Sequence, residues 1–354
     1  MKKIKTGVAS FGMSGLVFHA PLLHANSSFD LHSIVERSPK GAKDIYPHIH
    51  IVTSYDALLA DPSIELVIVN TPDSTHFDFC KQALLARKHV VVEKPFTIHS
   101  HQAAELIALA KEKRCVLSVF QNRRWDSDYL TVKKVVQNEL LGRLVSFESH
   151  FDRYRNFLKP NTWKEESITG AEILYNLGAH MADQAYDLFG MPQSVFAEIG
   201  IQRSGGKADD YYTLNLKYDG LSVTLKASYL VREEGPRYAL HGTMGSFLKW
   251  GMDVQEDDLK SGKSPNHADW GAEPKKQWGK LNTEKDGLHF TGRIESIPGD
   301  YNAYYDNIAA AIRQQSPLVV APEQSLDVLR ILEAAIESHT KGVRVPLDVL
   351  TYMM

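Results

Sequence analysis

The sequence has little of what marks several common protein classes. Its 354 residues include only two cysteines, Cys80 and Cys115, which excludes a disulfide scaffold and is typical of free thiols in a reducing compartment. Lys and Arg number 40 against 43 Asp and Glu, so the basic excess of a nucleic-acid-binding protein is missing. The longest apolar runs, such as Leu66–Val69, are far below the ~20 residues that span a bilayer. We therefore expect a cytoplasmic protein with neither a nucleic-acid nor a membrane partner.

Composition and length are those of an ordinary globular protein. Apolar residues make up 43% of the chain and charged residues 23%, which excludes a disordered chain, a collagen and a coiled coil. At ~150 residues per domain the length favours a little over two domains.

Short β-branched runs alternate with helical patterns over the first 120 residues. Several of the runs, such as Val90–Val92, have no polar alternation, so both of their faces must be covered, as in a parallel sheet. The pattern predicts an α/β Rossmann domain with a doubly wound parallel sheet. The expected strands are Ile4–Ala9, Leu31–Glu36, Ile49–Thr53, Glu65–Asn70, His89–Val92 and Cys115–Phe120, with helices at Thr75–Arg87 and Ser100–Lys113.

The pattern changes after about residue 123, where alternating strands predict an α+β domain with a large open, mainly antiparallel sheet. We therefore place domains at 1–122 and 123–354, with the C-terminal helices packing back toward the first domain. Residues 251–298 are polar and are expected to be a long excursion with little regular structure. The expected strands are Arg143–Arg153, Ser194–Gln202, Tyr211–Tyr218, Leu221–Leu230 and Arg237–His241, and the helices Asp126–Glu139, Glu172–Phe189, Tyr301–Gln314 and Glu323–Lys341.

A glycine-containing turn follows the first predicted strand. Residues 10–15 match the dinucleotide-binding turn, except that Ser10 stands where the first glycine normally stands. Gly12 permits close approach of a pyrophosphate, Gly15 permits close packing of the helix on the strand, and the first N–H groups of the helix hold phosphates. We interpret Phe11, Gly12, Met13 and Gly15 as cofactor-binding residues. The alternative is a tight turn with a structural role alone.

The second predicted strand carries conflicting signals about the cofactor. Glu36 at its end can bind both ribose hydroxyls of NAD and would repel a 2′-phosphate. Arg37 and Ser38 beside it are groups that a 2′-phosphate prefers, although Arg37 can also be a solvated charge stacked on adenine. The sequence favours NAD(H) over NADP(H) by a narrow margin.

Strand His89–Val92 leads directly into Glu93-Lys94-Pro95. Ligands of open α/β sheets bind at the carboxyl ends of the strands, where a stiff buried strand places Lys94. A lysine there can hydrogen-bond a substrate hydroxyl while hydride leaves the same carbon, with Glu93 orienting it. The alternative is an ordinary surface lysine at a strand end.

Together these residues resemble the Gfo/Idh/MocA family of nicotinamide-dependent sugar and polyol dehydrogenases, and most closely its members acting on scyllo-inositol. Asn70-Thr71-Pro72, Glu93-Lys94-Pro95, the segment 121–126 and the segment 174–184 carry the resemblance. It implies catalytic roles for Lys94 and His180. It also implies a cofactor site to which Thr71, Pro72, His76, Glu93 and Lys94 contribute.

His180 lies on a predicted helix with Asn176 four residues before it and Asp183 three after, so the three are expected to share a face. Histidine suits proton exchange near neutral pH. The alternatives are a core histidine satisfied by Asp183 and a metal pair with Asp183, for which no third ligand is evident. Many family members carry aspartate at the position of Asn176, and an amide cannot exchange a proton as a carboxylate does. The resemblance therefore implies that Lys94 lacks this support here.

Arg124 and Trp125 follow the last strand of the first domain, and Trp163 lies in the second. A flat aromatic ring suits the face of a sugar or inositol, and arginine suits hydroxyl groups. We predict substrate contacts for these residues and Asp183. The alternative is a solvated arginine and a Trp125 that packs in an interface.

The resulting prediction is an NAD(P)-dependent oxidoreductase that moves hydride between nicotinamide and a secondary alcohol of a sugar or cyclic polyol. The cofactor is NAD(H) or NADP(H), no metal is expected, and the resemblance implies a homodimer or homotetramer formed through the C-terminal sheet. The rivals are a non-catalytic NAD(P)-binding sensor and an NAD-dependent glycosidase, which fold alone cannot separate.

Overall fold

The computed structural model describes residues 2–38, 41–160, 165 and 173–347, which divide into two compact units. The first unit contains the chain up to Asp126 together with Val254–Gly271 and Gly299–Leu326. The second contains Ser127–Asp253, Ala272–Pro298 and the residues from Asp327 on. The sequence predicts one boundary after residue 122, whereas both units are discontinuous along the chain.

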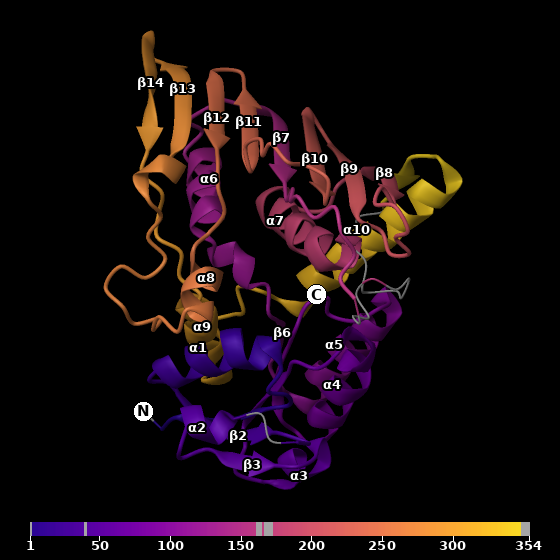
Figure 1. Cartoon of the computed structure of the whole chain (residues 1–354), viewed down its shortest axis with the longest axis vertical. Coiled ribbons are helices and arrows are strands. Elements are labelled where there is room, and N and C mark those ends of the chain that lie inside the picture. The colour runs from indigo at the N-terminus through magenta and orange to yellow at the C-terminus, as the bar shows by residue number, and fades with distance from the viewer. Residues whose placement is uncertain (1, 39–40, 161–164, 166–172, 348–354) are drawn as a thin grey trace. The chain divides into compact units, whose positions relative to one another are not determined.

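The first unit is built on a six-stranded parallel sheet with strand order β3-β2-β1-β4-β5-β6. Figure 1 labels β2, β3 and β6 of this sheet. This confirms the predicted doubly wound sheet. All four residues of β4 are buried, as expected for a strand covered on both faces. The strands are β1 Ile4–Val8, β2 Phe29–Val35, β3 His50–Val52, β4 Leu66–Val69, β5 His89–Val92 and β6 Leu117–Val119.

Helices cover the sheet of the first unit, and α4 and α5 are neighbours. A late segment, α9, packs into the core beside α1, where Tyr304 and Tyr305 meet Phe18, Leu22 and Phe120. The helices are the π-helical turn η1 Gly15–His19, α1 Ala20–Ala25, α2 Ala42–Ile45, α3 Tyr55–Ala60, η2 Asp73–Thr75, α4 His76–Leu85, α5 Ser100–Lys113, η3 Asn122–Trp125, α8 Gln255–Lys260 and α9 Asn302–Ile312.

The second unit is built on a nine-stranded sheet with strand order β14-β13-β12-β11-β7-β10-β9-β8-β15. Only β7 and β10 pair in parallel, so the predicted mainly antiparallel sheet is confirmed. The strands are β7 Leu144–His150, β8 Ser194–Gly200, β9 Tyr211–Tyr218, β10 Leu221–Ser228, β11 Tyr238–Gly242, β12 Gly245–Lys249, β13 Gly279–Lys285, β14 Leu288–Ile294 and β15 Val345–Pro346.

One face of this sheet is buried beneath helices. The Tyr238 hydroxyl donates to Gln184 Oε1 at 2.7 Å, and the Tyr212 hydroxyl contacts Met181 Sδ, so α7 lies on this face. The helices are α6 Ser127–Gln137, the π-helical turn η5 Leu174–Gly178, α7 Ala179–Phe189 and the 3-10 turn η6 Lys275–Gln277, and α10 Pro322–Lys341 crosses the division between the units.

The prediction of little regular structure in residues 251–298 is wrong. The segment contains α8, η6 and the hairpin β13–β14. The two strands are joined at Asp286-Gly287, where both residues have positive φ (54° and 76°), the geometry that Asp-Gly provides in a two-residue turn. Leu288, Phe290 and Ile294 alternate with polar residues, but six of the seven residues of β14 are exposed, so this alternation does not mark a buried face.

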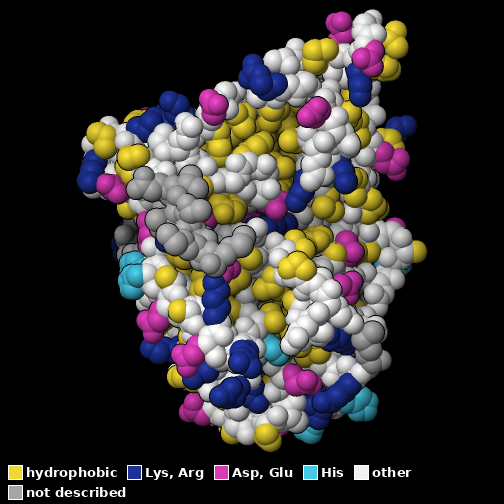
Figure 2. Space-filling view, turned by 180° about the vertical axis from the view of Figure 1, so that it is seen from behind, with side chains coloured by type: hydrophobic (Ala, Val, Ile, Leu, Met, Phe, Trp, Pro, Cys, Tyr) yellow, Lys and Arg dark blue, Asp and Glu magenta, His cyan; other side chains and the backbone are white. Residues whose placement is uncertain are grey.

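Two properties of the described residues concern partners. None of the helices they form combines the length and the apolar character needed to cross a membrane. On the face shown in Figure 2, basic and acidic side chains are interspersed rather than segregated by sign.

Candidate active site

The turn after β1 has the geometry of a nucleotide-binding turn. A Cβ atom on Gly15 would lie 2.2 Å from the backbone oxygen of Ser10, so only glycine fits there. A Cβ atom on Gly12 would meet only Ser10 Oγ at 3.5 Å, which leaves open space above the turn. Ser10 does not have a positive φ, so its position does not require glycine, and its hydroxyl accepts a hydrogen bond from Gly12 N at 3.2 Å. Phe11 is buried against Tyr46, whereas Met13 is exposed.

Asn70, which the sequence analysis mentioned only as part of a motif, completes this turn. Its Nδ2 donates to the Ser10 backbone oxygen at 2.8 Å and lies 3.4 Å from Ser14 Oγ. Its Oδ1 is buried and has no hydrogen-bond partner among the described residues. The turn also enters η1 without a side-chain cap. Open space, uncapped N–H groups and an orphaned acceptor together fit a bound nucleotide. The signal in the sequence was the position of Asn70 directly after β4.

The loop after β2 differs from the arrangement the sequence suggested. Glu36 is buried, and its carboxylate accepts a hydrogen bond from Ala42 N at 3.0 Å, at the start of α2. Arg37 and Ser38 are exposed. The acidic side chain therefore turns into the loop, and the basic and hydroxyl side chains face solvent.

His76 is fully buried at the start of α4. Its ring nitrogens lie 2.8 Å from the Pro95 backbone oxygen and 3.0 Å from that of Thr71. The ring thus ties together the segments that follow β4 and β5. Thr71 Oγ1 bonds Thr75 Oγ1 at 2.6 Å, and Pro72, which is exposed, begins that turn.

Glu93 and Lys94 lie at the carboxyl end of β5, as predicted. Glu93 Oε1 lies 3.0 Å from His19 Nε2, and Glu93 Oε2 accepts a hydrogen bond from Lys94 N at 3.1 Å. His19 Nδ1 is in turn 2.6 Å from the Tyr305 hydroxyl. Burial alone raises the pKa of the Glu93 carboxyl, but the hydrogen bond with His19 and the charge of Lys94 hold it below its usual value. Nothing in the sequence near Glu93 pointed to His19 or Tyr305.

The structure does not support the predicted substrate contacts of Arg124 and Trp125. The Arg124 guanidinium is buried and donates to the Val319 backbone oxygen and to Gln324 Oε1, at 3.2 and 3.0 Å. The Trp125 ring is partly buried and packs edge-on against Tyr304. Both side chains hold the core of the first unit together, because segments from residues 299–326 supply their partners. Trp163 lies outside the described residues.

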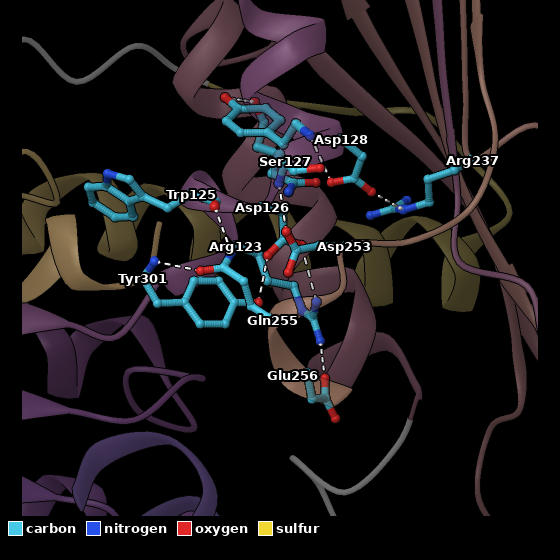
Figure 3. A network of polar contacts seen from close by, with 12 residues as sticks. Arg123, Trp125, Asp126, Ser127, Asp128, Arg237, Asp253, Gln255, Glu256 and Tyr301 are labelled. Atoms are coloured by element: carbon cyan, nitrogen blue, oxygen red, sulfur yellow. Dashed lines mark hydrogen bonds and ion pairs between the residues drawn. The ribbon is translucent and has the colours of Figure 1, made fainter. Parts of the chain in front are cut away.

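Figure 3 draws a network of polar contacts around residue 126. In the first unit, Arg123 bonds Asp126 and Glu256 at 3.1 and 2.7 Å, and the Tyr301 hydroxyl donates to Asp126 Oδ1 at 2.7 Å. In the second unit, Ser127 N donates to Asp253 Oδ2 at 2.8 Å. These contacts fix the backbone on either side of residue 126.

In the second unit, His180 and Asp183 are buried on α7, and Asn176 is half-buried in the preceding turn η5. The predicted continuous α-helix is here a π-helical turn followed by an α-helix, because Ala179 N donates to Leu174 O five residues back. The spacing of Asn176 and His180 therefore spans a widened turn. Within the described ranges, no group of three or more His, Cys, Asp and Glu side chains is arranged to hold a metal ion.

Comparisons with known proteins agree on one family. Two models of the Gfo/Idh/MocA family match, the "Oxidoreductase family, NAD-binding Rossmann fold" at residues 4–121 and the "Oxidoreductase family, C-terminal alpha/beta domain" at residues 133–347. The chain is 39% identical over 345 residues to a scyllo-inositol 2-dehydrogenase (NADP(+)) of Bacillus subtilis, covering 98% of this chain and 96% of that protein.

Solved structures agree as well. A Bacteroides fragilis crystal structure is 48% identical with a TM-score of 0.91 and covers 98% of this chain and 100% of that one. An oxidoreductase from Bacillus cereus is 33% identical with a TM-score of 0.91 and covers 98% of this chain and 99% of that one.

Proposed function

This chain belongs to the Gfo/Idh/MocA family of NAD(P)-dependent oxidoreductases that act on CH–OH groups, and we propose that its substrate is a cyclic polyol of the inositol class. The observation that carries the proposal is its similarity, along almost the whole chain, to a relative whose name states scyllo-inositol as its substrate. The position of Lys94 supports it, because Lys94 follows the carboxyl end of β5, and open α/β sheets bind ligands at the carboxyl ends of their strands.

We propose NADP(H) as the preferred cofactor, in place of the NAD(H) that the sequence favoured. The support is the burial of Glu36, whose Oε1 accepts a hydrogen bond from Ala42 N. Arg37 and Ser38 face solvent and are the groups that bind a 2′-phosphate. Gly12, Gly15 and Asn70 would hold the pyrophosphate and the adjoining part of the nucleotide.

The reaction divides among a few residues. When bound, the nicotinamide accepts or returns the hydride. Lys94, as an ammonium group, donates a hydrogen bond to the substrate oxygen and stabilises the negative charge that develops there. His180 accepts the hydroxyl proton on oxidation and returns it on reduction, and Asp183 on the same helix supports the ring. Asn176, half-buried in the preceding turn η5, offers an amide where the family resemblance implies aspartate.

A substrate panel tests the proposal. Purified protein is mixed with NADP+ or NAD+ and with scyllo-inositol, myo-inositol, glucose or galactose, and formation of reduced nicotinamide is followed by absorbance. We expect turnover with an inositol and NADP+, and none for a Lys94→Met control of similar side-chain length. Turnover with aldoses alone would refute the polyol assignment. Binding of NADPH without turnover of any alcohol would favour the non-catalytic sensor.

We also propose that the open face of the nine-stranded sheet joins copies of the chain into a homodimer or homotetramer. Across β7, β10, β9 and β8 one row of paired residues is fully buried, whereas the next row, which faces the other way, is half-exposed and mixed in character. The half-exposed row is Glu148, Thr224, Asn215 and Phe196. A Thr224→Arg variant should shift the light-scattering mass toward the monomer, and an unchanged mass would place the interface elsewhere.

A further inference from the structure

We propose that His19 and Tyr305 are positioning residues for Lys94. Through two hydrogen bonds they hold the Glu93 carboxylate ionised and oriented beside Lys94, which keeps the Lys94 amine a cation able to bind the substrate oxygen. The inference rests on the proposed function for what Lys94 does with its charge. It goes beyond that function by naming the groups that maintain the charge.

The contacts form one continuous series of hydrogen bonds within the first unit, from Tyr305 through His19 to Glu93. The Tyr305 hydroxyl lies 2.6 Å from His19 Nδ1, and His19 Nε2 lies 3.0 Å from Glu93 Oε1. The second carboxylate oxygen accepts a hydrogen bond from the backbone N–H of Lys94 at 3.1 Å. One neutral tautomer of His19, with its proton on Nε2, satisfies every partner: the Tyr305 O–H donates to Nδ1, and Nε2–H donates to Glu93. All the donors then point toward the carboxylate.

Burial makes this chain electrostatically effective. His19 and Tyr305 are fully buried, and the Glu93 side chain is 14% exposed. The titratable groups that interact with Glu93 are His19 from η1, Lys94 from its own segment, and Tyr304 and Tyr305 from α9. Burial raises the pKa of both phenols, so each stays uncharged and Tyr305 remains a donor. The charge of the Lys94 amine lowers the pKa of the Glu93 carboxyl, and by the same interaction the ionised carboxylate favours the cationic form of that amine.

A structural role alone explains the chain less well. The surrounding core is aromatic, and the His19 ring lies 4.5 Å from the Phe120 ring. Three apolar side chains in place of Tyr305, His19 and Glu93 would fill such a core at a lower desolvation cost than these hydrogen-bonded polar groups do. His19 is also the last residue of the π-helical turn that opens at Gly15, and such turns occur frequently at functional sites.

The charge of Lys94 can be measured without substrate or cofactor. The lysines are reductively methylated with ¹³C-formaldehyde, and the Lys94 signal is assigned by its absence in a Lys94→Arg variant. The chemical shift is then followed against pH in parent and variants. We expect Tyr305→Phe to lower the Lys94 titration midpoint by about half a pH unit, and His19→Leu by about one unit. His19→Gln retains an N–H donor toward Glu93 and should restore most of the midpoint.

Tyr304→Phe is the matched control. Tyr304 is equally buried one residue away, but its hydroxyl donates to Ser118 Oγ at 3.2 Å and not to His19. The Lys94 titration midpoint in Tyr304→Phe should equal that of the parent protein. A parent-like midpoint in both Tyr305→Phe and Glu93→Gln would overturn the inference. Glu93→Gln removes the charge without changing the shape, so the test survives if His19→Leu does not fold.

The outcomes separate this inference from the proposed function. The titration uses neither polyol nor cofactor, so a shifted midpoint supports the positioning role even if no inositol is oxidised. Conversely, inositol turnover that depends on Lys94, combined with an unmoved midpoint, would leave the proposed function standing and refute the roles of His19 and Tyr305. With an active substrate, the alkaline limb of the kcat/KM profile should move to lower pH in Tyr305→Phe and stay in place in Tyr304→Phe.

Discussion

The two glycines of the turn after β1 should respond differently to the same added methyl group. In Gly15→Ala the new Cβ atom would lie 2.2 Å from the Ser10 oxygen and 2.9 Å from Asn70 Nδ2. Ordinary contact begins at 3.4 Å, so turn and helix must separate by roughly 1.2 Å. Overpacking of this kind costs about 1–3 kcal/mol. We expect Tm to fall by about 4–8 °C for a 2 kcal/mol loss.

Gly12→Ala isolates the effect on the cofactor. Its Cβ atom would meet only Ser10 Oγ at 3.5 Å, so stability should stay within about 0.5 kcal/mol of the parent. The methyl group would occupy the space that a pyrophosphate enters. We therefore expect the Kd for NADPH to rise by at least about tenfold, equivalent to ~1.4 kcal/mol. Gly15→Ala should lose both stability and affinity.

Thermal denaturation and NADPH fluorescence titration measure the two effects separately. Gly200→Ala, where nothing lies within 4 Å of the new atom, is the control for a glycine substitution as such. If Gly15→Ala kept the parent Tm, the close approach of Ser10 would be refuted. If Gly12→Ala bound NADPH as tightly as the parent, the cofactor would have to bind elsewhere.

Four further substitutions each test the role of one side chain. Lys94→Ala should reduce kcat by ~10²–10⁴-fold with NADPH affinity within a few-fold of the parent, and a nearly unchanged kcat would exclude the catalytic role. Arg37→Ala should weaken NADPH binding about tenfold and leave NADH binding unchanged, as compared by titration; equal losses would remove the 2′-phosphate contact. Asn176→Asp adds a carboxylate near His180, so the acidic limb of the pH–rate profile should move to higher pH; an unmoved limb would place Asn176 too far from the base. The hydrogen bond of Asp152, with Glu148 nearby, raises the pKa of His150 above 6.5 despite its burial, so this stabilisation is complete below pH 6.5 and is lost as pH rises through the raised value. His150→Gln should therefore flatten the Tm–pH curve above pH 6.5, and a curve identical to that of the parent would show that the pair contributes nothing.

Features that depend on neighbouring residues were predictable. Buried runs such as Val90–Val92 must be covered on both faces, so their composition already indicated a parallel sheet. In a parallel sheet the carboxyl ends of the strands meet at one edge, which placed Lys94 correctly at the end of β5. Gly15 was predictable for the same reason, because its requirement comes from the adjacent strand and turn.

Features that depend on residues far apart in the sequence could not be predicted from the sequence. The carboxylate of Glu36 could face a ribose or the loop, and the loop geometry turned it toward Ala42 N. Arg124 looked like a substrate ligand until residues 299–326 supplied its partners. The β13–β14 hairpin was missed because the polar composition of residues 251–298 outweighed two readable signals, which are the alternation of Leu288, Phe290 and Ile294 with polar residues and the Asp286-Gly287 turn.

The sequence by itself determined the class of this protein: a parallel sheet, a nucleotide-binding turn and a lysine at a strand end, each specified by composition or by spacing within a few residues. Only the tertiary structure decided what surrounds that lysine. Tyr305 lies 286 residues from His19 along the chain, and their hydrogen bond exists because α9 returns to pack beside α1. A contact of that kind depends on the packing of whole elements, which no local pattern records.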